Sequence, residues 1–460
     1  MVPVLLQHGA TAVAEHGEPT SAIFGWSALA VATVIFVLTY AVVMSERFNR
    51  ANVALLAAGL TVLLGVINQH QAVAGVDFNT IGLLVGMMLI VAVTRETGVF
   101  QFLAIWSAKK VKAKPWGILL MLSLVTAVTS AFLDNVTTVL LIVPVTLVLT
   151  EELEVPPYPF LFAEILFSNI GGTATLIGDP PNIMIGSQVE YITFLDFMVH
   201  LGPVVIVVMI ATLLPIYLIW GRKLHATDEA RQRVMEFDEK AAITDWPLLI
   251  KCLIVLGAVI FGFIVGHPFG FEPATIAVTG GALLMLLSNL GRKIDEKNER
   301  THHFFGHVEW TTIFFFVGLF IVVAGVEHAG LLDLLADQIV ERTAGDRAAI
   351  SYAVLWVSAV ASAIVDNIPF VATMIPTLKT VIADLGMSQS DSMALWWSLA
   401  LGACLGGNGS LVGASANLIV AGFAERAGQR IQFTKFLLHA FPLMLMSIAI
   451  CHVYVMLRYL

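Results

Sequence analysis

One pattern in this sequence occurs twice. Residues 130–137 read SAFLDNVT and residues 362–369 read SAIVDNIP, so an Asp-Asn pair returns after 232 residues inside otherwise apolar sequence. A Gly-rich stretch follows each copy, GGTATLIG at 171–178 and GGNGSLVG at 406–413. Two copies of one unit, each with a carboxylate and glycines inside an apolar segment, are typical of a membrane transporter that is built from repeats.

The composition indicates that most of the chain lies in lipid. Of 460 residues, 58% are hydrophobic and 12% are charged, whereas an ordinary soluble domain is about 25% charged. The sequence contains no basic patch of the kind that would indicate a nucleic-acid partner. Residues 1–21 contain no Lys or Arg, which argues against a signal peptide and predicts a short external tail. The cysteines lie in apolar segments without metal-ligand spacing, which predicts inert packing roles for Cys252, Cys404 and Cys451.

Apolar stretches long enough to cross a membrane alternate with shorter or broken ones. The stretches at 160–190 and 392–424 contain Gly-rich sequence, and we expect each to cross with an unwound centre. The stretches at 116–150 and 349–383 are interrupted by Asp-Asn and are short for two full crossings, which favours re-entrant hairpins over crossing ones. Simple crossings are expected at about 22–44, 51–69, 78–98, 197–220, 247–266, 272–290, 309–326 and 434–457.

These segments predict an all-α polytopic membrane protein of two inverted repeats. Repeat 1 spans 22–220 and repeat 2 spans 247–460, joined by a polar linker at 221–246, and each has five crossings, one of them a broken helix, plus one re-entrant hairpin. If the hairpins do not cross, twenty Lys and Arg fall on one side and four on the other. The positive-inside rule then makes the linker cytoplasmic and places both termini outside a cell (inner) membrane.

The two Asp-Asn pairs are the first candidates for function. An ionised carboxylate inside a bilayer is costly unless it has a partner, so each predicts an ion or substrate site, with sodium a candidate near Asp134 and Asp366. The alternative is that each Asp caps the helix that follows, and both roles can hold together. The first pair is followed by two threonines and the second by Pro-Phe, so the two sites are not expected to be equivalent. The candidate residues here are Asp134, Asn135, Thr137, Thr138, Asp366 and Asn367.

The two Gly-rich breaks supply a second set of candidates. Glycine permits backbone conformations that expose carbonyls and amides, and Pro180-Pro181 interrupts the helix. The alternative is that the glycines only allow helices to pack closely. Asp179 has no acidic counterpart, because Ala414 takes its place in the second copy. The candidate residues are Asn169, Gly172, Thr173, Thr175, Gly178, Asp179, Asn182, Asn408, Ser410, Ser415 and Asn417.

Other charged residues lie at the edges of these segments. Glu164 precedes the first break without an acidic counterpart, and it is either a proton relay or a wet residue near the interface. Arg95 with Glu96, and Glu327 with His328, occupy matched positions at the ends of two crossings, and we expect interfacial ion pairs there.

Together these motifs resemble the ion transporter superfamily. They are DNVTT from 134, NIGGTAT from 169, GDPPN from 178, VEW from 308, DNIPF from 366 and GACLGGNGSLVGASAN from 402. The similarity is greatest to the branch that holds the pigmentation P protein, with arsenite permeases, D-type sodium–proton antiporters and citrate–metal transporters nearby, and it covers roughly 25–458. The resemblance implies a homodimer with a fixed scaffold and a mobile part, made of the hairpins and broken helices, that moves as an elevator.

The predicted function is secondary active transport of a small inorganic ion, coupled to sodium or protons, by alternating access. The Asp at each tip stands where dicarboxylate-transporting relatives have Ser, which favours a cation or proton there. The alternatives are an arsenite-, citrate- or chloride-type anion permease and a channel-like anion conductance. An intramembrane aspartyl protease also needs two membrane aspartates, but the repeat and Asp-Pro-Pro argue against it, so no enzymatic activity is expected. Apart from bound sodium no cofactor is expected, and the partners are the lipid bilayer and a small ion.

Overall fold

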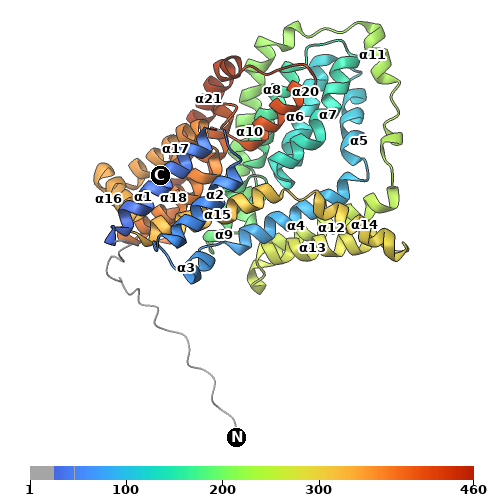
Figure 1. Ribbon diagram of the computed structural model, residues 1–460. Helices are drawn as coiled ribbons and strands as arrows, with labels where there is room; N and C mark the ends of the chain where they lie inside the picture. The colour runs from blue at the N-terminus through green and yellow to red at the C-terminus, as the bar shows by residue number, and fades with distance from the viewer. Residues whose placement is uncertain (1–24, 46) are drawn as a thin grey trace.

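The computed structural model describes residues 25–45 and 47–460, and helices account for most of them (Figure 1). The tail predicted at 1–21 lies outside the described residues. A helix lies at each predicted simple crossing, because a continuous apolar run satisfies its backbone polar groups internally only as a helix. These helices are α1 (Ala28–Met44), α2 (Arg50–Leu63), α4 (Phe78–Arg95), α10 (Phe194–Ile219), α12 (Trp246–Val265), α13 (Pro273–Ser288), α15 (Trp310–His328) and α21 (Phe433–Tyr459).

Five of these helices are long and apolar enough to cross a membrane, while α1, α2 and α13 are apolar but shorter. Three further helices of the described chain, Pro115–Phe132, Asn135–Glu152 and Arg347–Ile364, are also long and apolar enough. The outer faces of α10 and α12 expose large apolar side chains, among them Ile210, Leu214, Ile254 and Phe261. Such faces are unfavourable in water and are what a lipid-facing helix requires. The chain is therefore a polytopic helical membrane protein.

Two helix pairs lie where the sequence predicts hairpins. They are α6 (Pro115–Phe132) with α7 (Asn135–Glu152), and α17 (Arg347–Ile364) with α18 (Asn367–Asp384). Each limb has 18 residues, or about 27 Å at 1.5 Å per residue. Leu133 and Val365 adopt extended backbone conformations, which ends the first limb of each pair immediately before the Asp.

The two broken segments each consist of two α-helices joined by a stretch that is not α-helical. The first is α8 (Tyr158–Gly172) followed by α9 (Pro180–Gln188). The second is α19 (Gln389–Gly406), the short η5 (Gly407–Gly409) and α20 (Ser415–Arg426). Pro180 is the first residue of α9, where its missing N–H costs no hydrogen bond. The breaks expected from glycine and proline therefore occupy residues 173–179 and 407–414.

Each broken segment packs closely against the first limb of a hairpin. α8 lies on α6 and α19 lies on α17. A Cβ at Gly171 would be 2.1 Å from the carbonyl oxygen of Ala127, and one at Gly406 would be 2.6 Å from that of Ala359. Only glycine allows these backbones to approach so closely, so close helix packing accounts for part of the glycine pattern.

The remaining long helices form the other part of the protein. α4 packs against α13, α2 packs against α15, and α12 and α1 extend these pairs. In Figure 1, α6, α7, α8 and α20 lie together above α4, α12 and α13. The helix α5 (Val99–Lys110) connects α4 to the first hairpin, and α16 (Leu331–Thr343) connects α15 to the second.

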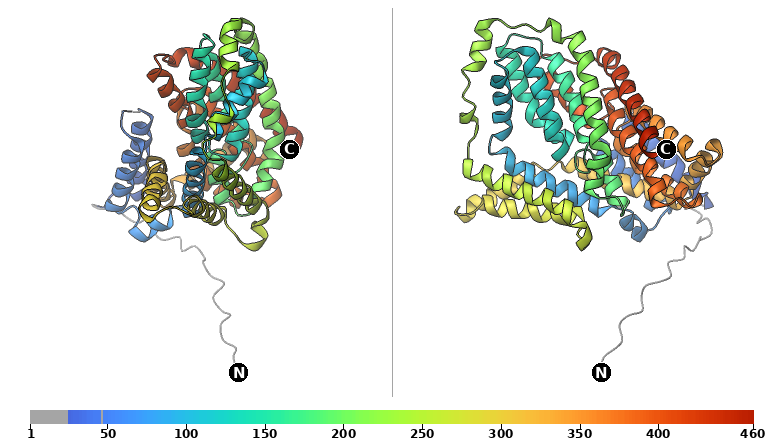
Figure 2. Two further views of the ribbon diagram at one scale, coloured as in Figure 1. Left: turned by 90° about the vertical axis from the view of Figure 1, so that its right-hand side faces the viewer. Right: turned by 180° about the vertical axis from the view of Figure 1, so that it is seen from behind.

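The polar linker runs along the outer edge of the molecule beside α5 (Figure 2). Its helix α11 (Asp228–Met235) lies at the outer end of the first hairpin, where Arg233 pairs with Glu154 at 2.6 Å. Further along, Lys109 of α5 donates to Glu239 at 2.5 Å. The linker thus contacts both the connecting helix and the hairpin.

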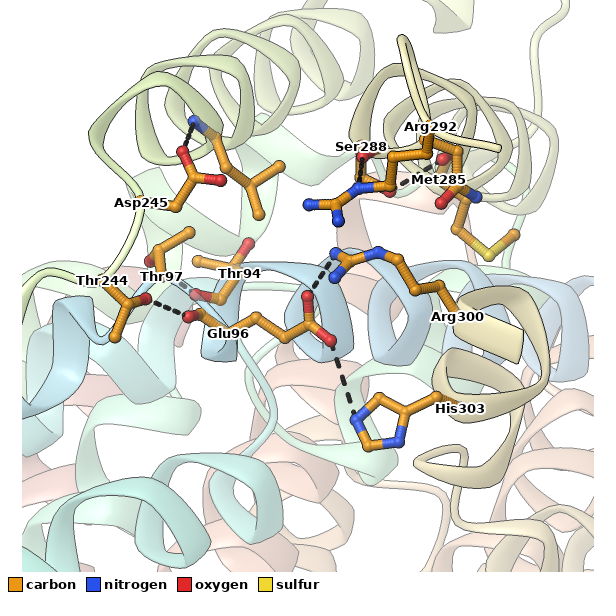
Figure 3. Close-up of polar contacts among 12 residues, drawn as sticks. Thr94, Glu96, Thr97, Thr244, Asp245, Met285, Ser288, Arg292, Arg300 and His303 are labelled. Carbon is orange, nitrogen blue, oxygen red and sulfur yellow. Dashed lines mark hydrogen bonds and ion pairs between the residues drawn. The ribbon is translucent and has the colours of Figure 1, made fainter. Parts of the chain in front are cut away.

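The end of α4 carries a cluster of polar contacts (Figure 3). The carboxylate of Glu96 pairs with Arg300 of α14 (Ile294–Gly306) and lies 3.7 Å from Nε2 of His303. The Thr244 hydroxyl of the linker donates to the Glu96 carbonyl oxygen at 2.5 Å. Glu96 therefore pairs with a residue more than two hundred positions away, which differs from the expected ion pair with its neighbour Arg95.

Candidate functional site

Both hairpin tips have an aspartate as helix N-cap. Oδ1 of Asp134 accepts a hydrogen bond from the backbone N–H of Thr137 at 2.8 Å, and the Thr137 hydroxyl donates to Oδ2. Oδ1 of Asp366 accepts from the backbone N–H of Ile368 at 3.3 Å. The capping role weighed from the sequence is thus present at both tips. It leaves Oδ2 of Asp366 to other partners.

A cluster of side-chain amides joins the first tip to both breaks. Oδ1 of Asn169 accepts from Nδ2 of Asn135 at 3.0 Å. Nδ2 of Asn169 donates to Oδ1 of Asn408 at 2.9 Å and to Oδ1 of Asn417 at 3.0 Å. All four side chains are buried, so their mutual hydrogen bonds remove what would otherwise be large desolvation costs. The cluster fixes the position of the first tip relative to both breaks.

Two asparagines hold the breaks themselves. Nδ2 of Asn182 donates to the carbonyl oxygens of Thr173 at 3.1 Å and Thr175 at 2.9 Å. Nδ2 of Asn417 donates to the carbonyl oxygens of Gly407 and Ser410, both at 2.8 Å. These amides replace the backbone hydrogen bonds that the helices lose at each break. The carbonyls concerned are already paired within the protein.

The hydroxyls of the breaks bond to backbone as well. Thr173 donates to the carbonyl oxygen of Asn169 at 2.7 Å, Thr175 to that of Ala131, and Ser410 to that of Ala363 at 2.5 Å. Gly172 and Gly178 approach each other so closely that a Cβ on Gly172 would be 2.5 Å from the Gly178 oxygen. These residues therefore shape the breaks. The hydroxyl of Thr138, in α7, is buried and has no hydrogen-bond partner in the described part of the chain.

A small cavity lies between the two tips and the first break. Its volume is about 20 Å³, enough for one water-sized particle, since about 10–15 Å³ suffices for one. Of the residues predicted from the sequence, those that line it are Asp134, Asn135, Asp179, Asn367 and Ser415. The site therefore has room for a single small ion in this conformation.

Asp179 is the most deeply buried carboxyl group of the cavity. Its side chain is 0% exposed. Oδ1 accepts from Nδ2 of Asn367 at 3.3 Å, and Oδ2 has no hydrogen-bond partner among the described residues. A buried carboxyl oxygen without a partner is costly, and a bound cation or proton removes that cost. The cavity thus offers carboxylate, amide and hydroxyl oxygens, which are the ligands that hard cations take.

Two further residues of the site were not predicted as site residues from the sequence, although Glu309 belongs to the VEW motif at 308. Arg50, at the start of α2, places Nη1 2.7 Å from Oδ2 of Asp366. The same guanidinium donates to the Ser415 hydroxyl and, at 3.3 Å, to that of Thr312. Glu309, immediately before α15, lines the small cavity too. The sequence signal for Arg50 was its position at the edge of an apolar segment. The count of Lys and Arg on each side of the membrane included it only as a residue of a cytoplasmic connection.

Two wider cavities adjoin the small one. A cavity of 490 Å³ is lined by Arg50, Asp366, Ser415, Met44 and Phe48. A cavity of 410 Å³ lies beside the first tip and is lined by Thr137 and by residues 306–311. Glu309 lines all three cavities. The small cavity therefore has a wider cavity beside each tip.

Glu164 lies apart from these cavities and is not among the residues that line them. Its side chain is 1% exposed, so the alternative of a wet residue near the interface is wrong. Oε1 accepts from the Thr146 hydroxyl, and Oε2 has no partner in the part of the chain that the structure describes. Glu164 is thus a buried acid of α8 that bonds to the second limb of the first hairpin. Its role as a proton relay stays a prediction.

A polytopic helical protein whose interior aspartates lie at two hairpin tips and one helix break has the architecture of a membrane transporter. Comparisons with known proteins agree with this class. The family model "Citrate transporter" matches residues 40–402, and the chain belongs to this family of the ion transporter superfamily.

The relatives include proteins of similar length and a longer one. An uncharacterized transporter of Mycobacterium tuberculosis is 43% identical over 93% of this chain and 98% of its own length. The 46 kDa membrane protein of Mycobacterium leprae is 41% identical over 94% and 99%. The human P protein is 33% identical over 92% of this chain, which spans 59% of that protein. The crystal structure of the YdaH transporter of Alcanivorax borkumensis has a similar fold, with a TM-score of 0.58, 13% identity and coverage of 92% and 97%.

Proposed function

We propose that the protein is a secondary active transporter that couples sodium or protons to the movement of a small inorganic ion by alternating access. One observation carries this proposal. Asp134 and Asp179 line the small cavity, and Asp366 lines the wider cavity beside it. Arg50 lines both cavities and pairs with Asp366. Because the acids outnumber the base there, the site favours a cation. In this proposal the protein moves its substrate across the membrane without changing it chemically. It requires no cofactor other than the coupling ion, sodium or a proton.

The size of the small cavity supports an ion as the occupant of the tips. About 20 Å³ admits one water-sized particle. Citrate does not fit between the tips in this conformation. The cavity of 490 Å³ beside Arg50 is large enough for such an anion, which makes an ion-coupled citrate- or arsenite-type permease the second candidate.

We further propose two inverted repeats with re-entrant hairpins. Matching contacts in the two halves support this arrangement. The Ser130 hydroxyl donates to the carbonyl oxygen of Ser168 at 2.6 Å, and the Ser362 hydroxyl donates to that of Ala403 at 2.7 Å. Both tips end beside the interior cavities, where non-helical backbone has polar partners.

In this proposal the hairpins and broken helices move together as an elevator against α2, α4, α13 and α15, within a homodimer in the cell (inner) membrane. Both wide cavities are lined by residues at connections that the charge bias assigns to the cytoplasm, Met44 and Phe48 in one and 306–308 in the other. The conformation described is then inward-facing, and both termini lie outside.

Transport in proteoliposomes with an internal pH-sensitive dye tests this function, with sodium, lithium, chloride, arsenite and citrate supplied in turn. Asn caps helices about as well as Asp. Asp134→Asn and Asp366→Asn therefore remove the charge while keeping the cap, and we expect each to abolish coupled flux while the protein elutes as a folded species in detergent. Asp384→Asn, on the exposed end of α18, is the matched control and should retain flux. If both tip variants retained full proton-coupled flux, the two aspartates would serve only as helix caps and the proposed coupling role would be wrong.

A further inference from the structure

The two tips differ in what neutralises their aspartates. Asp134 has its Thr137 bonds and forms no ion pair among the described residues. Asp366 is paired with Arg50 at 2.7 Å. The side chains of this pair are only 24% and 14% exposed, so the pair is far less screened than a surface salt bridge. In this conformation a cationic side chain of the protein itself neutralises Asp366 at the second tip, whereas Asp134 at the first tip has no such partner among the described residues.

Arg50 reaches the tip from a different part of the protein. It begins α2, which packs against α1 and α15, and its guanidinium lies 5.1 Å from the ring of Phe315 in α15. Asp366 and Ser415 belong to the second hairpin and the second broken segment. The ion pair therefore links the part that we propose as scaffold to the part that we propose as mobile.

The guanidinium also occupies a position with the chemistry of a cation site. Nη1 contacts Oδ2 of Asp366 and the hydroxyl of Ser415, and that hydroxyl lies 2.9 Å from the same carboxylate oxygen. A carboxylate and a hydroxyl oxygen side by side are ligands for a hard cation such as sodium. Arg50 and a free cation cannot both hold this position.

We propose that Arg50 is a tethered counter-cation, which holds the second tip when no ion is bound and competes with the transported cation for Asp366. Movement of the second tip away from α2 frees Asp366 and makes it a cation ligand. A cation bound there in turn releases Arg50 and weakens the link between the two parts. This inference rests on the proposed cation coupling, and it names Arg50 as a residue that sets the affinity of the second tip.

Sodium-dependent thermal stabilisation in detergent tests the competition. NaCl is titrated against choline chloride at constant ionic strength for the wild type, Arg50→Gln and Arg47→Gln. Arg47 is an exposed arginine in the connection just before α2 and serves as the matched control. We expect Arg50→Gln to lower the sodium concentration for half-maximal stabilisation at least about tenfold, the size of a typical coupling between competing ligands. We expect Arg47→Gln to match the wild type.

Two further variants separate competition from a purely structural role. In the double variant Arg50→Gln/Asp366→Asn the high-affinity response should disappear, because the ligand is lost. Lys keeps the charge but lacks the planar fork that bonds two groups at once, so Arg50→Lys should give an intermediate midpoint. Arg50→Gln could instead lower the melting temperature while its sodium concentration for half-maximal stabilisation equals that of Arg47→Gln. Arg50 would then have only a structural role, and the proposal would be wrong.

A measurement on the wild type needs no substitution at the site. Phenylglyoxal modifies accessible guanidinium groups, and peptide mass spectrometry follows each arginine separately. Sodium should increase the modification rate of Arg50 and leave that of Arg47 unchanged, whereas an unchanged rate at Arg50 overturns the competition. Failure of the proposed function has a different signature. Sodium would then shift the Arg50→Gln melting curve as expected while the wild type shows no coupled flux in proteoliposomes.

Discussion

Substituting Gly171 tests whether close helix packing positions the first break. In Gly171→Ala the new Cβ would lie 2.1 Å from the carbonyl oxygen of Ala127, a backbone atom that no side-chain rotation can move away. Ordinary contacts begin near 3.4 Å, so α8 and α6 must separate by roughly 1 Å. Overpacking of this kind costs about 1–3 kcal/mol, and the rigid backbone partner places Gly171→Ala near 3 kcal/mol. The separation also moves Asn169, two residues earlier, away from its amide partners.

Thermal unfolding in detergent, followed by tryptophan fluorescence, measures this cost. The matched control is Gly257→Ala in α12, where an added Cβ meets nothing within 4 Å. Alanine favours a helix over glycine by about 1 kcal/mol, so the control should melt at or above the wild-type temperature. Gly171→Ala should melt clearly lower and lose ion-dependent stabilisation. Equal melting temperatures for the two variants would show that the contact between α6 and α8 does not hold the break.

Two other substitutions give distinct expected results. Asn169→Leu removes the hydrogen bonds that Asn169 makes to three buried atoms, Nδ2 of Asn135 and Oδ1 of Asn408 and Asn417. It should lower stability by at least about 3 kcal/mol, read from the same melting curves. Glu239→Gln probes the linker, because the hydrogen bond from Lys109 holds the pKa of Glu239 below its ordinary value. This contribution is present above the unfolded pKa and lost as pH falls through the folded one, so the melting difference from wild type should narrow as pH falls below about 4.5. A difference that is constant or grows on acidification would contradict that assignment.

The sequence predicted the helices and the breaks well because both depend on local chemistry. Uninterrupted apolar runs give the simple crossings, and Pro180 with the glycines around 171–178 and 406–413 marks the non-helical segments. The Asp-Asn pairs mark the hairpin tips because Asp is a good N-cap wherever a helix must restart. Each of these inferences needs only a few neighbouring residues.

Contacts between distant parts of the chain could not be predicted from this sequence. Asp366 meets Arg50 across 316 positions and Glu96 meets Arg300 across 204, distances in sequence that carry no periodic signal. Asn182 was interpreted as part of the solute lining, whereas its amide donates to carbonyls of its own break. Spacing shows that a polar side chain is near a break, but only the folded backbone determines whether it faces the cavity or the protein.

Access to the second break from each side of the membrane tests the central claim most directly. Val412 lines the wide cavity beside Asp366, and the native cysteines are buried. A Val412→Cys variant is treated with a membrane-impermeant maleimide in intact cells and in inside-out vesicles. Alternating access predicts labelling from both sides, with sodium shifting the ratio of the two rates. Labelling from one side alone under every ionic condition would contradict a site that opens to each side in turn.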